Sequence, residues 1–280
     1  MQQQYLAMAI TAAAAFGIAT TDSWAADLYV NDEYIEEDEE AEPPIPAEQD
    51  TLAGNCEDAD YETIAEALAD AVTGDTIILC NCDEEGGDPL LTTYFPDDGD
   101  IATILIPVEI ESITIRSAFG PDRCIVSGTN AVGTQYPVVR LDFAGQELTL
   151  GDPSDPGGGF FIQDGAAPSE DIYPPIDPSG DSNVSRGGGI RVMGQDAIVE
   201  VYDCTITGNG SFEDGGAAYC HFGSTLSMIN CTIAGNVANN RGGGIYCDPV
   251  GTVELFGCSV DSNVSAYAGG GIFAPEGSTV

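Results

Sequence analysis

Apolar and polar residues alternate over short stretches of residues 186–280, and these stretches recur in step along the chain. Polar residues such as Glu200, Ser227 and Glu254 stand between the apolar ones. A period of two is typical of a strand that buries one face. The apolar positions form four columns: Val199/Leu226/Val253, Val201/Met228/Leu255, Cys204/Cys231/Cys258 and Ile206/Ile233/Val260. The pattern predicts short strands whose inward side chains stack from one repeat to the next.

Glycine and asparagine positions keep the same period. Glycine-rich segments begin at Gly187, Gly215, Gly242 and Gly269, so their interval is nearly constant. A period in the twenties, with no helix-length apolar stripe, indicates a solenoid whose repeats are buried by their neighbours. We therefore expect an all-β, single-stranded right-handed parallel β-helix with coils of about 27 residues. Each coil should have three strands and three turns and rise by about 4.8 Å. A column at one turn should carry amides that bond from coil to coil: Asn209, Asn236 and Asn263.

Two stretches resemble the repeats of a known family. The stretch 206–209 (Ile-Thr-Gly-Asn) is followed by Gly215-Gly216-Ala217, and the stretch 233–236 (Ile-Ala-Gly-Asn) by Gly242-Gly243-Gly244. Both resemble the paired motifs of chlamydial-type polymorphic outer-membrane proteins. More widely, residues 60–280 resemble the pectin-lyase-like β-helix proteins. This resemblance implies the same fold and a location outside the cell.

Near the start of residues 60–280, the sequence pattern predicts one helix, residues 61–72, which is followed by a strand at 74–79. Ile64, Leu68 and neighbouring apolar residues fall on one helix face. The segment resembles the entry of pectin-lyase-like proteins, which implies a short capping helix over the first coil. The β-helix domain is assigned to residues 51–280. Because residues 269–280 repeat 242–253, the sequence stops inside a coil, and we expect a continuation of the protein or end-to-end association at this edge.

Residues 1–25 have the pattern of a signal peptide, with an apolar run at 6–18 and Ser23-Trp24-Ala25 as a cleavage site. The alternative is an uncleaved anchor, but the run is shorter than the ~20 residues that span a bilayer. Residues 26–50 are assigned to an acidic, disordered linker. We expect a secreted or cell-surface protein with no membrane span in the mature chain.

The net charge is −41, and all six basic residues are arginines. Such a chain would be repelled by a phosphate backbone, so nucleic acid is excluded as a partner. No cofactor is expected. Calcium is a candidate ion because it would screen self-repulsion, and no metal ligand set can be assigned.

The nine cysteines fall into two groups. Those at 204, 231 and 258 and those at 220 and 247 lie in inward columns, and stacked positions are somewhat too far apart for an unstrained bridge. We therefore expect a core ladder of free thiols, rather than disulfides or a metal site. Near the cap one disulfide is expected, from Cys56 to Cys80 or Cys82, with the partner left open.

Catalytic motifs of pectin-lyase-like enzymes, such as Gly-His-Gly and Arg-Ile-Lys, are absent. His221, the single histidine, points outward beside Asp248 of the next coil, which is either a catalytic pair or a surface contact. A ladder of Arg186, Asp214 and Arg241 is expected to be an ion pair between coils.

An outward aromatic column consists of Tyr219, Tyr246 and Phe273, with Arg191 below it. These rings either stack on sugar rings or only stabilise neighbouring coils. The function expected is that of a non-catalytic β-helix protein, adhesin-like or structural, with a carbohydrate or cell-surface ligand as candidate partner. The alternative is a polysaccharide lyase or glycoside hydrolase that acts on acidic polysaccharide.

Overall fold

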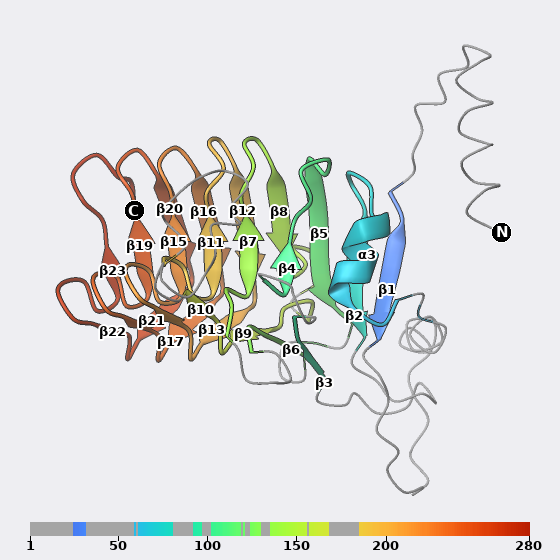
Figure 1. The fold of residues 1–280 in the computed structure, drawn as a ribbon, viewed down its shortest axis with the longest axis horizontal. Coiled ribbons are helices and arrows are strands. Elements are labelled where there is room, and N and C mark those ends of the chain that lie inside the picture. The colour runs from blue at the N-terminus through green and yellow to red at the C-terminus, as the bar shows by residue number, and fades with distance from the viewer. Residues whose placement is uncertain are drawn as a thin grey trace, which may run out of the picture.

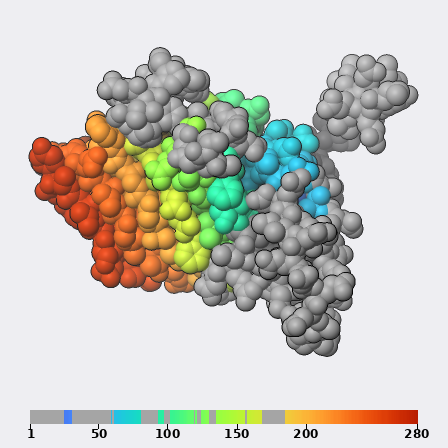
Figure 2. Space-filling view, turned by 60° about the horizontal axis from the view of Figure 1, so that its bottom comes forward, coloured from blue at the N-terminus to red at the C-terminus, as the bar shows by residue number. Residues whose placement is uncertain are grey.

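The computed structural model describes residues 25–31, 59, 61–80, 92–96, 102–118, 120, 124–129, 135–155, 157–167 and 185–280. These residues form the predicted parallel β-helix (Figure 1). Every strand pairs in parallel with the equivalent strand of the neighbouring coil. In the space-filling view the coils follow one another as bands of colour along the long axis (Figure 2).

Four parallel sheets run along this axis, where three were expected. Sheet I contains β1 (Asp27–Asn31), β2 (Thr76–Cys80), β5 (Ser112–Ser117), β8 (Glu147–Leu150), β12 (Ile198–Tyr202), β16 (Thr225–Ile229) and β20 (Thr252–Phe256). Sheet II contains β4 (Ile104–Leu105), β7 (Val139–Leu141), β11 (Ile190–Val192), β15 (Ala218–Cys220), β19 (Ile245–Cys247) and β23 (Ile272–Phe273). Sheet III contains β3 (Thr92–Tyr94), β6 (Cys124–Ser127), β9 (Phe161–Gln163), β13 (Thr205–Thr207), β17 (Thr232–Ala234) and β21 (Ser259–Asp261). Sheet IV contains β10 (Ala166–Ala167), β14 (Gly210–Ser211), β18 (Val237–Ala238) and β22 (Val264–Ser265).

Sheet IV was missed because its strands, such as Gly210–Ser211, are too short to show an alternating pattern. The turn before it also differs in one detail from the expectation. The left-handed residue is not the asparagine but the one before it, with φ of 66° at Gly208, 67° at Gly235 and 54° at Ser262. Glycine adopts this conformation without the steric cost of a Cβ atom. The asparagine side chain is therefore free to point inward.

The coils differ in length although sheets I to III stay in register from coil to coil. In sheet I, Ile113 pairs with Leu148 and Leu148 pairs with Val199, so the first coils are long and unequal in length. From Val199 onward the interval is shorter and constant, first to Leu226 and then to Val253. Extra residues therefore lie in the turns, while the inward positions stay in register.

The N-terminal end is closed by α3 (Ile64–Asp70), which is shorter than the predicted helix. It begins late because Thr63 is its N-cap: the Thr63 hydroxyl accepts from the Glu66 N–H, and the Glu66 carboxylate accepts from the Thr63 N–H. Ile64, Ala67 and Leu68 are buried, and the helix contacts β1, β2 and β4.

Strand β1 corrects the linker assignment. Residues 27–31 pair with β2 as the first strand of sheet I, so the β-helix begins inside the segment 26–50. An acidic composition over 32–50 hid the apolar Leu28 and Val30, whose side chains pack against the core. The rest of that segment, 32–50, and residues 1–24 of the proposed signal peptide lie outside the described residues.

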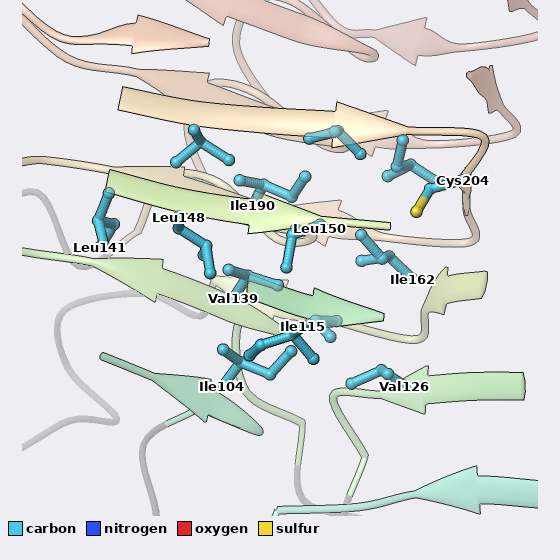
Figure 3. Close-up of a cluster of buried hydrophobic side chains, with 14 of the residues drawn as sticks. Ile104, Ile115, Val126, Val139, Leu141, Leu148, Leu150, Ile162, Ile190 and Cys204 are labelled. Atoms are coloured by element: carbon cyan, nitrogen blue, oxygen red, sulfur yellow. The ribbon is translucent and has the colours of Figure 1, made fainter. Parts of the chain in front are cut away.

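A single continuous core fills the interior from α3 to the last coil, and Figure 3 shows part of it. Ile104, Leu148 and Ile190, from three different strands, point into the same space. Near the last coil the packing is looser: Leu255 is only partly buried, whereas the sequence pattern predicted a fully buried position. Its predecessor in the column, Met228, is fully buried because strands pair on both of its sides.

Candidate functional site

The aromatic column lies on the outer face of sheet II, as the alternation predicted. Inward Ala218 and Cys220 flank Tyr219, so the phenol ring must point away from the core. Pairing places in one row, from coil to coil, Arg140, Arg191, Tyr219, Tyr246 and Phe273.

The rings of this column face one another. Ring centroids of Tyr219 and Tyr246 are 5.6 Å apart with planes 21° apart, and those of Tyr246 and Phe273 are 5.5 Å and 17° apart. The Arg186 guanidinium lies 5.3 Å from the Tyr219 centroid, and that of Arg241 lies 5.0 Å from the Phe273 centroid. Tyr219 is fully buried and Tyr246 is 7% exposed. This stacked geometry stabilises neighbouring coils and covers the rings of Tyr219 and Tyr246, whereas Phe273 is only partly buried.

A hydrogen-bonded cluster surrounds the Tyr219 hydroxyl. That hydroxyl donates to Asp248 Oδ2 at 2.6 Å and lies 3.1 Å from His221 Nδ1, and Arg186 Nη1 donates to it at 2.9 Å. His221 Nδ1 is 2.9 Å from Asp248 Oδ2, so the expected contact between His221 and Asp248 is present. The cluster joins three successive coils through one phenol oxygen.

Burial and hydrogen bonding set the charges in this cluster. Burial raises the pKa of Tyr219, and its hydrogen bond to Asp248 raises it further, so the phenol stays protonated. Burial would raise the pKa of Asp248, but hydrogen bonds from His221 and Tyr219 outweigh it and lower the pKa. The cluster thus holds a carboxylate whose partners are side chains of the protein itself.

Arg191 and Arg140 are placed in the same row but are 1% and 4% exposed. Arg140 Nη2 donates to Asp142 Oδ2 at 2.5 Å. Arg191 was a candidate ligand-binding residue below the aromatic column, and such a role would require an exposed guanidinium group. The structure buries both groups beneath the surface of sheet II.

The expected ladder of Arg186, Asp214 and Arg241 forms with a different geometry. Arg186 Nε lies 3.5 Å from Asp214 Oδ2 and donates to Glu213 at 2.8 Å. Arg241 contributes its backbone N–H to Asp214 Oδ1 at 3.1 Å, because its side chain covers Phe273. Burial raises the pKa of Asp214 despite the nearby Arg186.

The asparagine ladder is formed as expected. Asn209 Nδ2 donates to Asn236 Oδ1 at 3.0 Å, and Asn236 Nδ2 donates to Asn263 Oδ1 at 2.9 Å. The same oxygens accept the backbone N–H groups of the preceding coil, including that of Gly165 on Asn209 Oδ1 at 2.9 Å. Asn209 and Asn236 are buried, Asn263 is partly buried, and together these amides hold the turns together.

The cysteines of the ladder are free thiols, as predicted. Cys204 and Cys231 are buried, and Cys258 is partly exposed. Cys80 is disulfide-bonded. Cys56, its predicted partner, and Cys82, the alternative partner of Cys56, lie outside the described residues. Among the residues that are described, no group of three metal-ligating side chains occurs, and no helix is long and apolar enough to cross a membrane.

The sequence analysis did not predict that Glu213 accepts a hydrogen bond from Arg186, or that the Tyr219 hydroxyl lies at the centre of the cluster. Glu213 immediately precedes Asp214, which stands one repeat after Arg186, and that spacing was the available signal. Arg140 was missed because its partner in the row, Arg191, follows at a much longer interval than the constant repeat.

Comparison with known proteins gives one short match. The family model of the Chlamydia polymorphic membrane protein repeat matches residues 230–248, which contain β17, β18 and β19. No curated protein and no solved structure matches the chain. The match includes the motif at 233–236 and 242–244, whereas the wider pectin-lyase-like relationship stays a prediction. Part of one coil of this parallel β-helix, residues 230–248, is therefore similar to the Chlamydia polymorphic membrane protein repeat.

Proposed function

We propose that this protein is a secreted or cell-surface β-helix protein that acts without catalysis, as an adhesin-like or structural module. The observation that carries the proposal is that the repeated side chains join one coil to the next. Tyr219 and Tyr246 stack on each other, and Asn209 donates an amide hydrogen bond to Asn236. Residues used in this way build a long, rigid body with repeated outer faces.

Two features support a location at the surface. The matched repeat belongs to a family named for membrane proteins, and residues 1–25 have the pattern of a signal peptide. Export can be tested by producing the full chain and the segment 26–280 in a bacterial host. The full chain should leave the cytoplasm and the segment should remain there. If both the full chain and the segment stayed in the cytoplasm, residues 1–25 would no longer support a location at the surface.

The polar cluster on sheet II favours a structural role over catalysis. A catalytic group must reach its substrate, and the hydroxyl at the centre of the cluster belongs to Tyr219, which is fully buried. The His221 side chain is 27% exposed, but its Nδ1 lies against the Asp248 carboxylate and the Tyr219 hydroxyl. Asp248 is engaged by both His221 and Tyr219. For the same reason, we infer no sugar stacking on Tyr219 and Tyr246, since these rings are buried against other side chains, and Phe273 is only partly buried.

The test is incubation of the full chain with a panel of neutral and acidic polysaccharides, with and without calcium. We expect no new unsaturated or reducing ends. Activity that disappears in Asp248→Asn, while Glu254→Gln on the exposed face of sheet I remains active, would instead establish the lyase or hydrolase. Under this proposal the ring column is not the binding surface, so retention on any of these glycans should be unchanged in Phe273→Ala.

A further inference from the structure

One buried carboxylate lies at the place where the β-helix begins. Asp75 immediately precedes β2 and is 3% exposed. Its Oδ1 accepts the Ala26 N–H at 2.8 Å, and its Oδ2 accepts the Val72 N–H at 2.8 Å. Both oxygens of this carboxylate therefore hold the backbone around it, one before β1 and one after α3.

The bond to Ala26 aligns the first strand. Ala26 O accepts the Thr76 N–H at 2.8 Å, and the next residue, Asp27, already pairs with Thr76 as the first pair of β1 and β2. Ala26 is thus held on both sides of its Cα atom, at its nitrogen by Asp75 and at its carbonyl by Thr76. The nitrogen of Ala26 therefore has a fixed position against the carboxylate.

The partners of Asp75 do not balance its charge. Both are neutral backbone N–H groups, and among the described residues no arginine or histidine forms an ion pair with Asp75. A buried carboxylate is normally paired with a positive group, because burial removes the water that would stabilise its charge. A positive charge at the Ala26 nitrogen would therefore stabilise this carboxylate.

The expected cleavage site of the signal peptide lies at this same nitrogen. Residues 23–25 (Ser-Trp-Ala) are the expected recognition site for a signal peptidase, so the bond to be cut joins Ala25 to Ala26. Hydrolysis adds one water across that amide. The Ala25 carbonyl becomes a carboxylate, and the Ala26 nitrogen becomes an α-amino group, which is mostly protonated at pH 7.

We propose that Asp75 binds the α-ammonium group that cleavage after Ala25 creates at Ala26. The ion pair forms when the processed chain folds, and it replaces the hydrogen bond from an amide to the same carboxylate oxygen. A chain that keeps residues 1–25 has an amide at this position, so the ion pair favours the processed form. This inference rests on the export that belongs to the proposed function.

The charged groups near this site favour a positive charge at Ala26. The elements packed around it are α3, β1, β2 and the start of β5. With one exception their charged side chains are carboxylates: Asp27 of β1, Glu66 and Asp70 of α3, and Glu111 before β5. The exception is Arg116 of β5, which lies 3.8 Å from Asp152. Carboxylates nearby raise the pKa of an amine, because they stabilise its charged form.

The absence of lysine makes the ion pair measurable. A chain that begins at Ala26 has a single primary amine, and it contains every described helix and strand. It can be released from a fusion protein by a protease that leaves no extra residue. Reductive methylation with ¹³C-formaldehyde labels the amine and keeps its positive charge, and NMR follows its signal from pH 6 to pH 11. We expect it to titrate at least about one pH unit above the ordinary pKa of about 7.7–8.0.

Three altered chains isolate the ion pair. In Asp75→Asn the side-chain oxygen can still accept a hydrogen bond, but its charge is gone, so the amine should titrate near its ordinary value. One glycine added before Ala26 keeps the charge and restores the amide at Ala26, so this amine should also titrate near its ordinary value. Asp70→Asn removes an exposed carboxylate of α3 and should leave the raised titration in place. Circular dichroism shows which of these chains are folded.

Stability gives a second readout with a definite sign. A group whose pKa is raised by folding stabilises the fold only while it is protonated. At pH 6 the chain 26–280 should therefore melt at a higher temperature than the same chain with an acetylated amine. The difference should vanish as the pH rises through the raised pKa of the amine. In Asp75→Asn, acetylation should not change the melting temperature at either pH.

Three results would overturn the proposal. They are an amine of the chain 26–280 that titrates near its ordinary value, an equally raised titration in Asp75→Asn or in the glycine-extended chain, and an exported protein whose first residue is not Ala26. The last is read by mass spectrometry of the secreted full-length product. Retention of that product in the cytoplasm would contradict the proposed export and its processing, whereas an ordinary titration in a chain that is exported would contradict the ion pair alone.

Discussion

The coils before residue 168 and those after residue 184 share sheets I to III but build them from different sequence patterns, and the described strands of sheet IV begin only at β10. The constant-length coils, residues 185–280, repeat at a nearly fixed interval, whereas the variable-length coils, residues 27–167, are joined by longer and unequal steps. Yet Leu150 pairs with Val201 as directly as Val201 pairs with Met228. The comparison teaches that inward side chains set the register of a parallel β-helix. Constant spacing is not required, because the turns can absorb extra residues.

The largest expected effect tests whether both groups of coils share one core. Leu150 and Met228 occupy the same inward column and are fully buried. Leu150→Ala and Met228→Ala should each lower the free energy of unfolding by about 2–5 kcal/mol. Leu255→Ala should cost clearly less, because Leu255 is only partly buried. Denaturant unfolding measures all three. If one of Leu150→Ala and Met228→Ala lowered the unfolding free energy strongly and the other hardly changed it, the two groups of coils would not share one core.

A second comparison concerns the tight corners. A Cβ atom on Gly243 would lie 2.3 Å from Val264 O, and one on Gly165, in the variable-length coils, would lie 2.1 Å from Gly188 O. Gly243→Ala and Gly165→Ala should each destabilise by about 1–3 kcal/mol through overpacking. Gly210→Ala is the matched control, since its nearest neighbour would be 4.0 Å away. Equal thermal midpoints for all three variants would show that an added Cβ atom is accommodated at Gly243 and Gly165 without strain.

The amide ladder exists only in the constant-length coils among the residues described. Asn236 accepts from Asn209 and donates to Ile206 O and Asn263 Oδ1. Asn236→Ala should cost about 1–3 kcal/mol, because the buried groups left behind lose their partners. Asn239→Ala, at an exposed position, should change the unfolding free energy little. If the two variants unfold alike, the ladder does not stabilise these coils.

The smallest effect compares two carboxylates on sheet II. The lowered pKa of Asp248 stabilises the fold above its unfolded pKa, and this contribution is lost as pH falls through the folded pKa. The raised pKa of Asp214 has the opposite sign, because protonation on acidification favours the folded state. Unfolding between pH 7 and pH 3 should therefore show a destabilisation by Asp248→Asn that shrinks on acidification. In the native chain, protonation of Asp214 adds to the unfolding free energy as the pH falls, and Asp214→Asn should remove this increase. The same slope in both variants would contradict these assignments.

The fold was predictable because the repeats are visible wherever the turns are short. The columns of Val199, Cys204 and Ile206 identified the constant-length coils from the alternation alone. Strand β1 could not be found, because the acidic residues that follow it dominate the composition and its partner β2 comes only after that long acidic segment. Two-residue strands such as Val237–Ala238 carry no period at all.

The sequence predicted which side chains of the candidate site point outward from sheet II, but it did not predict how far those side chains are exposed to solvent. Alternation places Tyr219 and Tyr246 outward, and the repeat length places Asp248 beside His221. Whether an outward side chain meets solvent depends on what packs over the sheet, and a period does not contain that information. Arg186, which covers Tyr219, comes from the turn before β11, so only the structure could show that the ring faces are closed.

The most direct test of a single solenoid is a distance along one outward row of sheet I. Pairing places in that row, one coil apart, Asp27, Thr76, Thr114, Thr149, Glu200, Ser227 and Glu254. The chain has no lysine, so Asp27→Lys and Glu254→Lys supply two sites for amine-reactive spin labels once the N-terminal amine is blocked. Six strand spacings predict a narrow distance distribution near about 29 Å. When Thr76→Lys replaces Asp27→Lys, the distance to the label at Glu254→Lys should shorten by one strand spacing. A broad distribution, or a distance that does not shorten, would contradict the continuous β-helix.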